Sequence, residues 1–195
     1  MNDNLNYQNS EPIVLGSGEL YLVKSSEIAD PSALTTEEEA KLINVGAINS
    51  GASVTISKDL IDVYGKNRGL IKKIAKATNV TFKTGIISFI LKNVAEFLYG
   101  VDYLEDAVAG TKKIIIGDEN TPACYLRFIH TDKESGKQLI VNIYKTQFVG
   151  ENEFNFDDEE ATAVNYEFAG LPVNDGAGGK NSYVEFIEYD PSLEA

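Results

Sequence analysis

The sequence predicts a mainly β protein with mostly antiparallel strands and one amphipathic α-helix. Residues 123–148 hold two runs in which apolar and polar residues alternate, on either side of the polar stretch 131–137. A period of two around a turn containing Gly136 is typical of a long antiparallel hairpin. Strand-like alternation recurs at residues 163–169 and 183–189, and a helical apolar spacing occurs at residues 86–99.

The first third of the chain predicts strands joined by short turns. Residues 1–12 are polar and predict a flexible arm. Residues 13–24 predict a strand that is interrupted by a glycine-containing turn at 16–18. Thr35 and Glu38 have the spacing of a capping box, which predicts a short helix near residues 36–43. Residues 45–57 then predict one strand or two.

Residues 58–77 differ in charge from the rest of the chain. They hold six basic and two acidic residues, a local net charge of +4. We expect this segment to be an extended loop that lies at a subunit contact, and residues 80–84 to resume the strand pattern. The candidate contact residues in it are Lys66, Arg68, Lys72 and Lys73.

Residues 86–99 predict the main helix. Their apolar side chains recur at the i, i+3, i+4, i+7 spacing of one helical face, and Gly100 follows as a left-handed stop. We expect a helix of more than about ten residues that buries Ile90, Leu91, Val94 and Phe97 on the sheet. Residues 114–116 (III) predict a short buried strand.

The last third predicts an acidic turn, two strands and a glycine loop. Residues 150–160 contain six acidic residues, of which Glu151, Asp157, Asp158 and Glu159 are candidate partners for the basic segment of another copy. Residues 174–182 predict a glycine loop between the strands 163–169 and 183–189. The predicted organisation is an N-terminal arm (1–12), a main domain (13–169) with the extended loop 58–77, and a C-terminal strand and tail (170–195) that belong to the same domain.

The composition argues against several classes of function. A net charge of −13 over 195 residues disfavours a protein that grips nucleic-acid backbones, because phosphate binding needs a basic surface. Cys124 and His130 are the single members of their types, so no soft metal site is expected. Residues 176–180 lack the spacing of a phosphate-binding loop. We therefore expect no cofactor, no metal and no enzymatic activity.

Localisation follows from the ends of the chain and from its hydrophobic runs. The first residues lack the basic start and the apolar run of a signal peptide, and no stretch has the length of a membrane span. We expect a chain that is made in a cytoplasm and does not insert into a membrane.

Four features in one order carry a resemblance to a known family. They are residues 16–22 (GSGELYL), residues 45–52 (VGAINSGA) leading into a strand, a strand that runs into the single helix, and the hairpin followed by Gly150, residues 154–156 (FNF) and 166–169 (YEFA). With this order, the chain resembles the major tail tube proteins of long-tailed bacteriophages. It is most similar to those of flexible, non-contractile tails of phages that infect low-GC Gram-positive bacteria.

The resemblance implies a fold and an assembly. The fold would be a β-sandwich or half-barrel with one packed helix. Six copies would form a ring, with strands that continue from subunit to subunit, and stacked rings would form a tube in the virion. Partners would include the tape measure and tail terminator proteins, and DNA would pass through without specific binding. An acidic or neutral channel would conduct a polyanion by repulsion.

Two alternatives stay open on the sequence. One is a monomeric β-sandwich binding module, for instance for a carbohydrate. The other is the tube of a contractile tail or of a related injection device. A small enzyme of unknown type is the weakest alternative.

Overall fold

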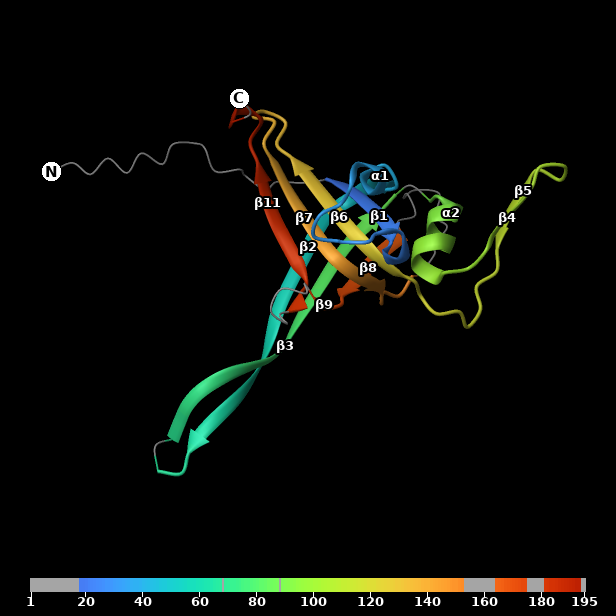
Figure 1. Cartoon of the computed structure of the whole chain (residues 1–195). Helices are drawn as coiled ribbons and strands as arrows, with labels where there is room; N and C mark the ends of the chain where they lie inside the picture. The colour runs from blue at the N-terminus through green and yellow to red at the C-terminus, as the bar shows by residue number, and fades with distance from the viewer. Residues whose placement is uncertain (1–17, 68, 88, 153–163, 175–180, 194–195) are drawn as a thin grey trace.

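A computed structural model describes residues 18–67, 69–87, 89–152, 164–174 and 181–193, and its elements are strands joined by short helical turns (Figure 1). The elements follow in chain order: β1 (Glu19–Lys24), η1 (Ser25–Glu27), α1 (Thr36–Glu39), β2 (Ile43–Gly65), β3 (Gly69–Ile86), α2 (Leu91–Asn93), η2 (Val94–Tyr99), β4 (Tyr103–Asp106), β5 (Thr111–Ile114), β6 (Ala123–Thr131), β7 (Gln138–Phe148), β8 (Val164–Gly170), β9 (Val173–Asn174), β10 (Asn181–Ser182), β11 (Val184–Tyr189) and η3 (Pro191–Leu193).

Seven strands form one antiparallel sheet that closes on itself. Their order is β11-β7-β6-β1-β2-β3-β8, and β7 pairs with β8 as well. The strands β7, β6, β1, β2, β3 and β8 therefore make a closed cycle of six, and β11 adds to the outside edge of β7. The predicted mainly β, antiparallel class with at least seven strands is confirmed.

The closure depends on β7 changing its neighbour along one edge. Residues 138–143 of β7 pair with β11, whereas Thr146, Gln147 and Phe148 pair with β8. The change takes two residues: the Tyr144 N–H donates to the carbonyl of Tyr183 (3.2 Å), and the next carbonyl, of Lys145, accepts from the N–H of Leu171 (2.7 Å). These two bonds pass the edge of β7 from the β11 side to the β8 side, so this main chain stays paired where the neighbour changes.

The core fills the inside of the closed sheet. Alternate residues of the strands point inward, and the helical segment α2–η2 adds Val94, Phe97 and Leu98 to the same cluster. Aromatic rings pack edge to face in it: Phe148 lies 5.9 Å from Tyr99 and 6.0 Å from Phe168 between ring centroids. Cys124 is fully buried, as the sequence predicts, and burial raises the pKa of its thiol to about 12.

Several local predictions are confirmed. The hairpin at residues 123–148 is β6–β7, with Gly136 at φ 71° in its turn. The side chain and the backbone N–H of Thr35 complete the capping box with Glu38 at the start of α1. The strands predicted at 163–169 and 183–189 are β8 and β11, and residues 45–57 belong to the single strand β2.

Three predictions are wrong. Residues 58–77 do not form a loop, because they continue β2 and β3 as a ladder that ends at Gly65 and Gly69. The helix begins at Leu91 and ends at Tyr99, nine residues in all, because β3 extends to Ile86 and residue Ile90 is still extended. Residues 115 and 116 are exposed and follow β5, so the isoleucine run is not a buried strand.

Some predictions concern residues outside the described ranges: the N-terminal arm (1–12), the turn at 16–17, the acidic residues 153–160 and the centre of the glycine loop (175–180). In the C-terminal part, β11 pairs with β7 and so belongs to the same sheet. Among the described residues, no helix has the length and apolar character needed to cross a bilayer.

The corrected helix boundary yields a stability prediction. Phe97 is 1% exposed, whereas Ile90 is 42% exposed although the helical spacing placed both in the core. Phe97→Ala should lower the free energy of unfolding by about 3–5 kcal/mol, because it leaves a cavity. Ile90→Ala should change it by only about 0.5 kcal/mol. Urea denaturation of the two variants measures both, and equal losses would contradict the boundary.

The closure yields a second prediction, at Gly170. A Cβ on this residue would lie 2.9 Å from the Val80 Cβ and 3.4 Å from a methyl carbon of Ile143, and neither can swing away. Gly170→Ala should therefore lower the free energy of unfolding by about 1–3 kcal/mol. Gly117→Ala is the control, because there the close neighbour is the mobile end of Glu119. Thermal unfolding compares the two, and a neutral Gly170→Ala would show that β8 is free to shift.

Candidate functional surfaces

The most prominent surface is a two-stranded hairpin that projects from the sheet, formed by residues 58–77 and called the arm here (Figure 1, lower left). Eight residues of β2, from Lys58 to Gly65, belong to it, a run of roughly 25 Å at the usual rise of a strand. Beyond Ser57, neither β2 nor β3 pairs with any other described strand until β3 reaches Val80. The arm therefore presents two open edges.

The arm carries apolar side chains on both faces. Pairing places Ile61, Ile74 and Val63 on one face, and Leu60 and Tyr64 on the other. Seven large hydrophobic side chains of the arm are exposed: Leu60, Ile61, Val63, Tyr64, Leu70, Ile71 and Ile74. An isolated two-stranded hairpin is marginally stable in water, and exposed apolar surface of this extent marks an interaction site.

The charges of the arm lie between these apolar residues. Lys66, Lys72 and Lys73 are exposed, and Lys73 pairs with Asp62 across the ladder (Nζ–Oδ1 2.9 Å). Arg68, the fourth basic residue predicted at a contact, lies outside the described residues. Subtracting the +4 of the arm from the total of −13 leaves −17 for the rest of the chain. The arm is thus a cationic projection on an anionic body.

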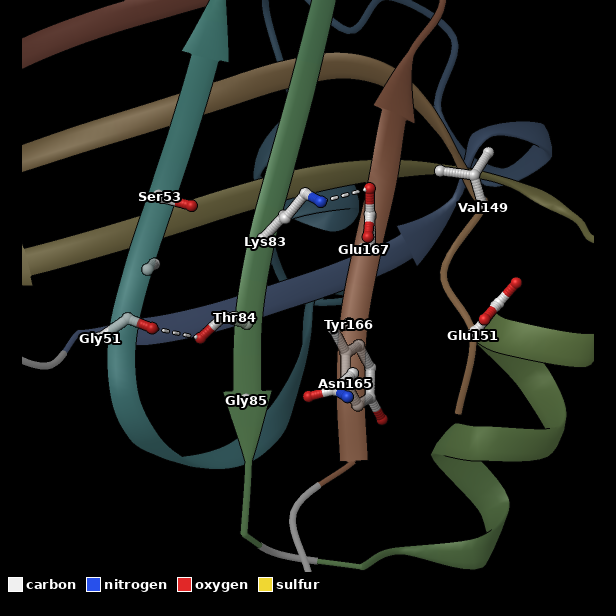
Figure 2. Close-up of a pocket in the computed structure, with 11 residues that line it drawn as sticks. Gly51, Ser53, Lys83, Thr84, Gly85, Val149, Glu151, Asn165, Tyr166 and Glu167 are labelled. Atoms are coloured by element: carbon white, nitrogen blue, oxygen red, sulfur yellow. Dashed lines mark hydrogen bonds and ion pairs between the residues drawn. The ribbon is translucent and has the colours of Figure 1, made fainter. Parts of the chain in front are cut away.

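A second surface is a hollow of about 680 Å³ on the outside of the sheet (Figure 2). Residues 51–53 of β2, 83–85 of β3 and 165–167 of β8 line it, with Val149 and Glu151 from the loop after β7. The small residues at 51, 52 and 85 leave the space. A shift in the β2–β3 register lies beside it, and the Thr84 hydroxyl donates to the carbonyl of Gly51 (2.9 Å).

The chemistry of the hollow is polar and largely satisfied within the chain. Lys83 Nζ lies 2.8 Å from Glu167 Oε1, as Figure 2 shows. Among the described lining residues, the aromatic one is Tyr166, which is 1% exposed and packs into the core. Sugar rings commonly stack on exposed aromatic faces, and the described lining offers none.

A third cluster lies on the outside of β6 and β7, around Arg127. Its Nη1 lies 2.6 Å from Glu39 Oε2 in α1, and its Nε donates to Asn142 Oδ1 (2.9 Å). The Asn142 amide in turn donates to Glu185 Oε2 on β11 (3.1 Å). These bonds hold α1 against β6 and add a side-chain link between β7 and β11, so the cluster has a structural role. Arg127 Nη2 also donates to the hydroxyl of Tyr125 (3.2 Å), which is fully buried.

The predicted contact residues fall into two groups, and the described members of these groups lie apart in the fold of a single chain. Lys66, Lys72 and Lys73 lie on the projecting arm, whereas Glu151 lies at the hollow. Asp157, Asp158 and Glu159 lie outside the described residues. The apolar residues of the arm were missed, although the glycines at 65 and 69 with alternating neighbours are a hairpin signal.

Comparisons with known proteins give no family. A scan against protein-family models and a search of curated proteins found no match to this chain. Within the described ranges, no three His, Cys, Asp or Glu side chains gather as a metal site would require. The buried His130 forms part of β6.

The start of α1 yields a pH prediction, because the Glu38 side chain binds both Thr35 and the preceding loop at Ala29. The buried Glu38 carboxylate accepts from the Ala29 N–H (2.6 Å), the Thr35 N–H (2.8 Å) and the Thr35 hydroxyl (2.9 Å). These donors, that of Ala29 first, hold the pKa of Glu38 below its usual value of 4.5. This contribution to stability is fully present above pH 4.5, and it is lost as the pH falls through the lower pKa that Glu38 has in the folded state.

Glu38→Gln should therefore be less stable than the wild type at pH 7, and the difference should shrink on acidification below the usual glutamate range. Glu37→Gln, an exposed neighbour on α1, is the control. Urea midpoints measured across pH 2–7 give the comparison. A difference that stays constant with pH would show that the carboxylate charge is irrelevant.

Proposed function

We propose that this chain is the structural subunit of a bacteriophage tail tube, of the long, flexible, non-contractile kind. Hexameric rings would stack into a conduit for the genome, in the virion, with tape measure and tail terminator proteins as partners. The role needs no cofactor and no catalysis. The tail-tube form of a sandwich or half-barrel belongs to this proposal, and the antiparallel sheet with one packed helix supports it.

The arm is the observation that carries the proposal. Seven exposed hydrophobic side chains on two faces of a narrow hairpin are not covered by any described part of the same chain. A monomer is not stabilised by a hairpin of this kind that extends into water. Burying its apolar surface would contribute about 25 cal/mol per Å², and the exposed hairpin lacks that contribution. Cover from neighbouring subunits on both faces removes the liability. A polymer in which each copy covers the arm of another supplies that cover.

The edge of the sheet and the charge fit the same role. β11 pairs with β7 on one side, and no described strand pairs with its other edge, where a strand of a neighbour can add. The body charge of −17 favours a channel that repels DNA, with the basic arm at subunit contacts away from it.

The alternatives differ in their support. The hollow is the natural site for a binding module, and its satisfied ion pair and buried Tyr166 disfavour carbohydrate recognition. The tube of a contractile tail or of a related injection device uses the same features, so it remains the second candidate.

The proposal predicts polymerisation that needs the arm. Light scattering after size-exclusion chromatography, with negative-stain microscopy, should show rings or tubes for the full chain. A shortened variant replaces residues 60–76 by Asn-Gly. This two-residue turn then connects Asp59 to Ala77, which are partners in the β2–β3 ladder. This variant should stay folded and monomeric.

Far-ultraviolet circular dichroism and thermal unfolding of the shortened variant provide the control for folding. A full chain that remains monomeric at all concentrations would contradict the tube. Tubes formed equally well without the arm would remove the observation on which the proposal depends.

A further inference from the structure

A second unpartnered hairpin projects from the other end of the molecule. Residues 101–121, called the lobe here, contain β4 and β5, which pair with each other and with no other described strand. Tyr103 and Ile114 anchor its base and are half-buried. In Figure 1 the lobe extends to the right of the helix, and the tip of the arm lies at the lower left, on the far side of the sheet.

The lobe exposes apolar side chains in a fixed conformation. Val108 at the tip is 100% exposed and Ile115 is 67% exposed, and Leu104 and Ile116 are exposed as well. The turn that carries Val108 is held by Asp106, whose Oδ1 accepts from the N–H groups of Val108 (2.9 Å) and Ala109 (3.0 Å). Gly110 follows at φ 64°, a backbone region that suits glycine. The tip is therefore a built turn that presents an apolar side chain.

We infer that the lobe is the docking surface for the arm of a second copy of this chain, an inference that rests on the proposed function and names its contact. Charge is the first reason: residues 101–121 hold five acidic and two basic residues, a net of −3 against the +4 of the arm. Apolar character is the second, because both segments expose large aliphatic side chains that need cover. Opposite charge with apolar surface on both sides is how protein contacts combine specificity with affinity.

The lobe fits the arm better than the acidic region near Glu151 does. Around Glu151, the large exposed hydrophobic side chain that the structure describes is Val149. The lobe offers four, and Phe89 and Ile90 at the start of the helix are exposed too. Among the described residues, the surface at Glu151 therefore offers charge with little apolar cover for the arm, whereas the lobe offers both.

The contact also has the right symmetry for a repeating assembly. The arm and the lobe are different surfaces on opposite sides of the folded molecule. Each copy would therefore place its arm on the lobe of the next copy and receive the arm of the previous one. Such a head-to-tail contact generates rings or open filaments, unlike the self-complementary contact of a two-fold dimer.

The test combines substitution with cross-linking of the full chain. Val108→Asp and Ile115→Asp place a charge on the lobe, and Leu193→Asp, at an 80% exposed residue of η3, is the matched control. The first two should raise the critical concentration for assembly by about tenfold or more, since each removes a buried aliphatic contact. Leu193→Asp should leave it unchanged. Melting temperatures confirm that all three fold.

Cross-linking locates the contact directly. A carbodiimide joins lysines to carboxylates, and mixing isotope-labelled with unlabelled chains identifies the links that form between two copies. We expect such links between Lys66, Lys72 or Lys73 and the carboxylates of residues 101–121. Lys72→Glu should weaken assembly and Lys133→Glu, in the exposed β6–β7 turn, should not.

The outcomes separate this inference from the proposed function. Tubes whose arm links fall at Glu151 or residues 153–160, with Val108→Asp behaving like Leu193→Asp, would overturn the docking surface and leave the tube intact. Arm-to-lobe links in a small oligomer would support the docking surface and contradict the tube. A chain that stays monomeric would contradict both.

Discussion

The fold depends on one strand, β7, that serves three partners. β6 occupies one edge along its length, while β11 and then β8 occupy the other, with the change at Tyr144 and Lys145. If β11 continued along this edge, β8 would be a free edge and the core would be open beside Phe168. A Cβ at Gly170 would lie 2.9 Å from the Cβ of Val80, so a residue without a side chain lets β8 lie close to β3 where the change occurs.

Closure also defines what is left over. Inside the cycle, the apolar residues are buried and the strands have their partners. The arm, the lobe and the outer edge of β11 lie outside it, and they carry most of the large exposed hydrophobic side chains. The sequence buries its core apolar residues, but two projecting hairpins leave apolar side chains exposed, and such exposed surface is typical of interaction sites. The proposed assembly rests on these two hairpins more than on the fold itself.

Local signals predicted the elements that local physics determines, and they missed those that tertiary pairing determines. The β6–β7 hairpin and the Thr35 cap depend on neighbours in sequence, so both were predictable. The helix start was not, because Ile86 and Ile87 fit a helical stripe as well as a strand, and pairing of Ile86 with Val164 decides for the strand. The sequence showed that the arm is basic, but it did not predict that the arm forms two paired strands. Two register shifts, next to Asp59 and Val63, interrupt the period of two that would indicate strands. The hollow at β2, β3 and β8 arises from strands far apart in sequence.

In the proposed assembly, charge and apolar surface have different consequences for the arm. Salt at physiological strength screens exposed charges beyond about 8 Å, so the +4 of the arm attracts an acidic surface only at short range and contributes little to a stable contact. In the proposed assembly, the attraction would orient the encounter, and burial of Ile61, Tyr64 or Ile71 would stabilise the complex once formed. The arm places lysines between its hydrophobic residues, so the same hairpin would stay in solution before assembly and bind its neighbour after it. A purely apolar arm would aggregate without register, and a purely charged one would dissociate; the alternation of both in residues 58–77 meets the two demands at once.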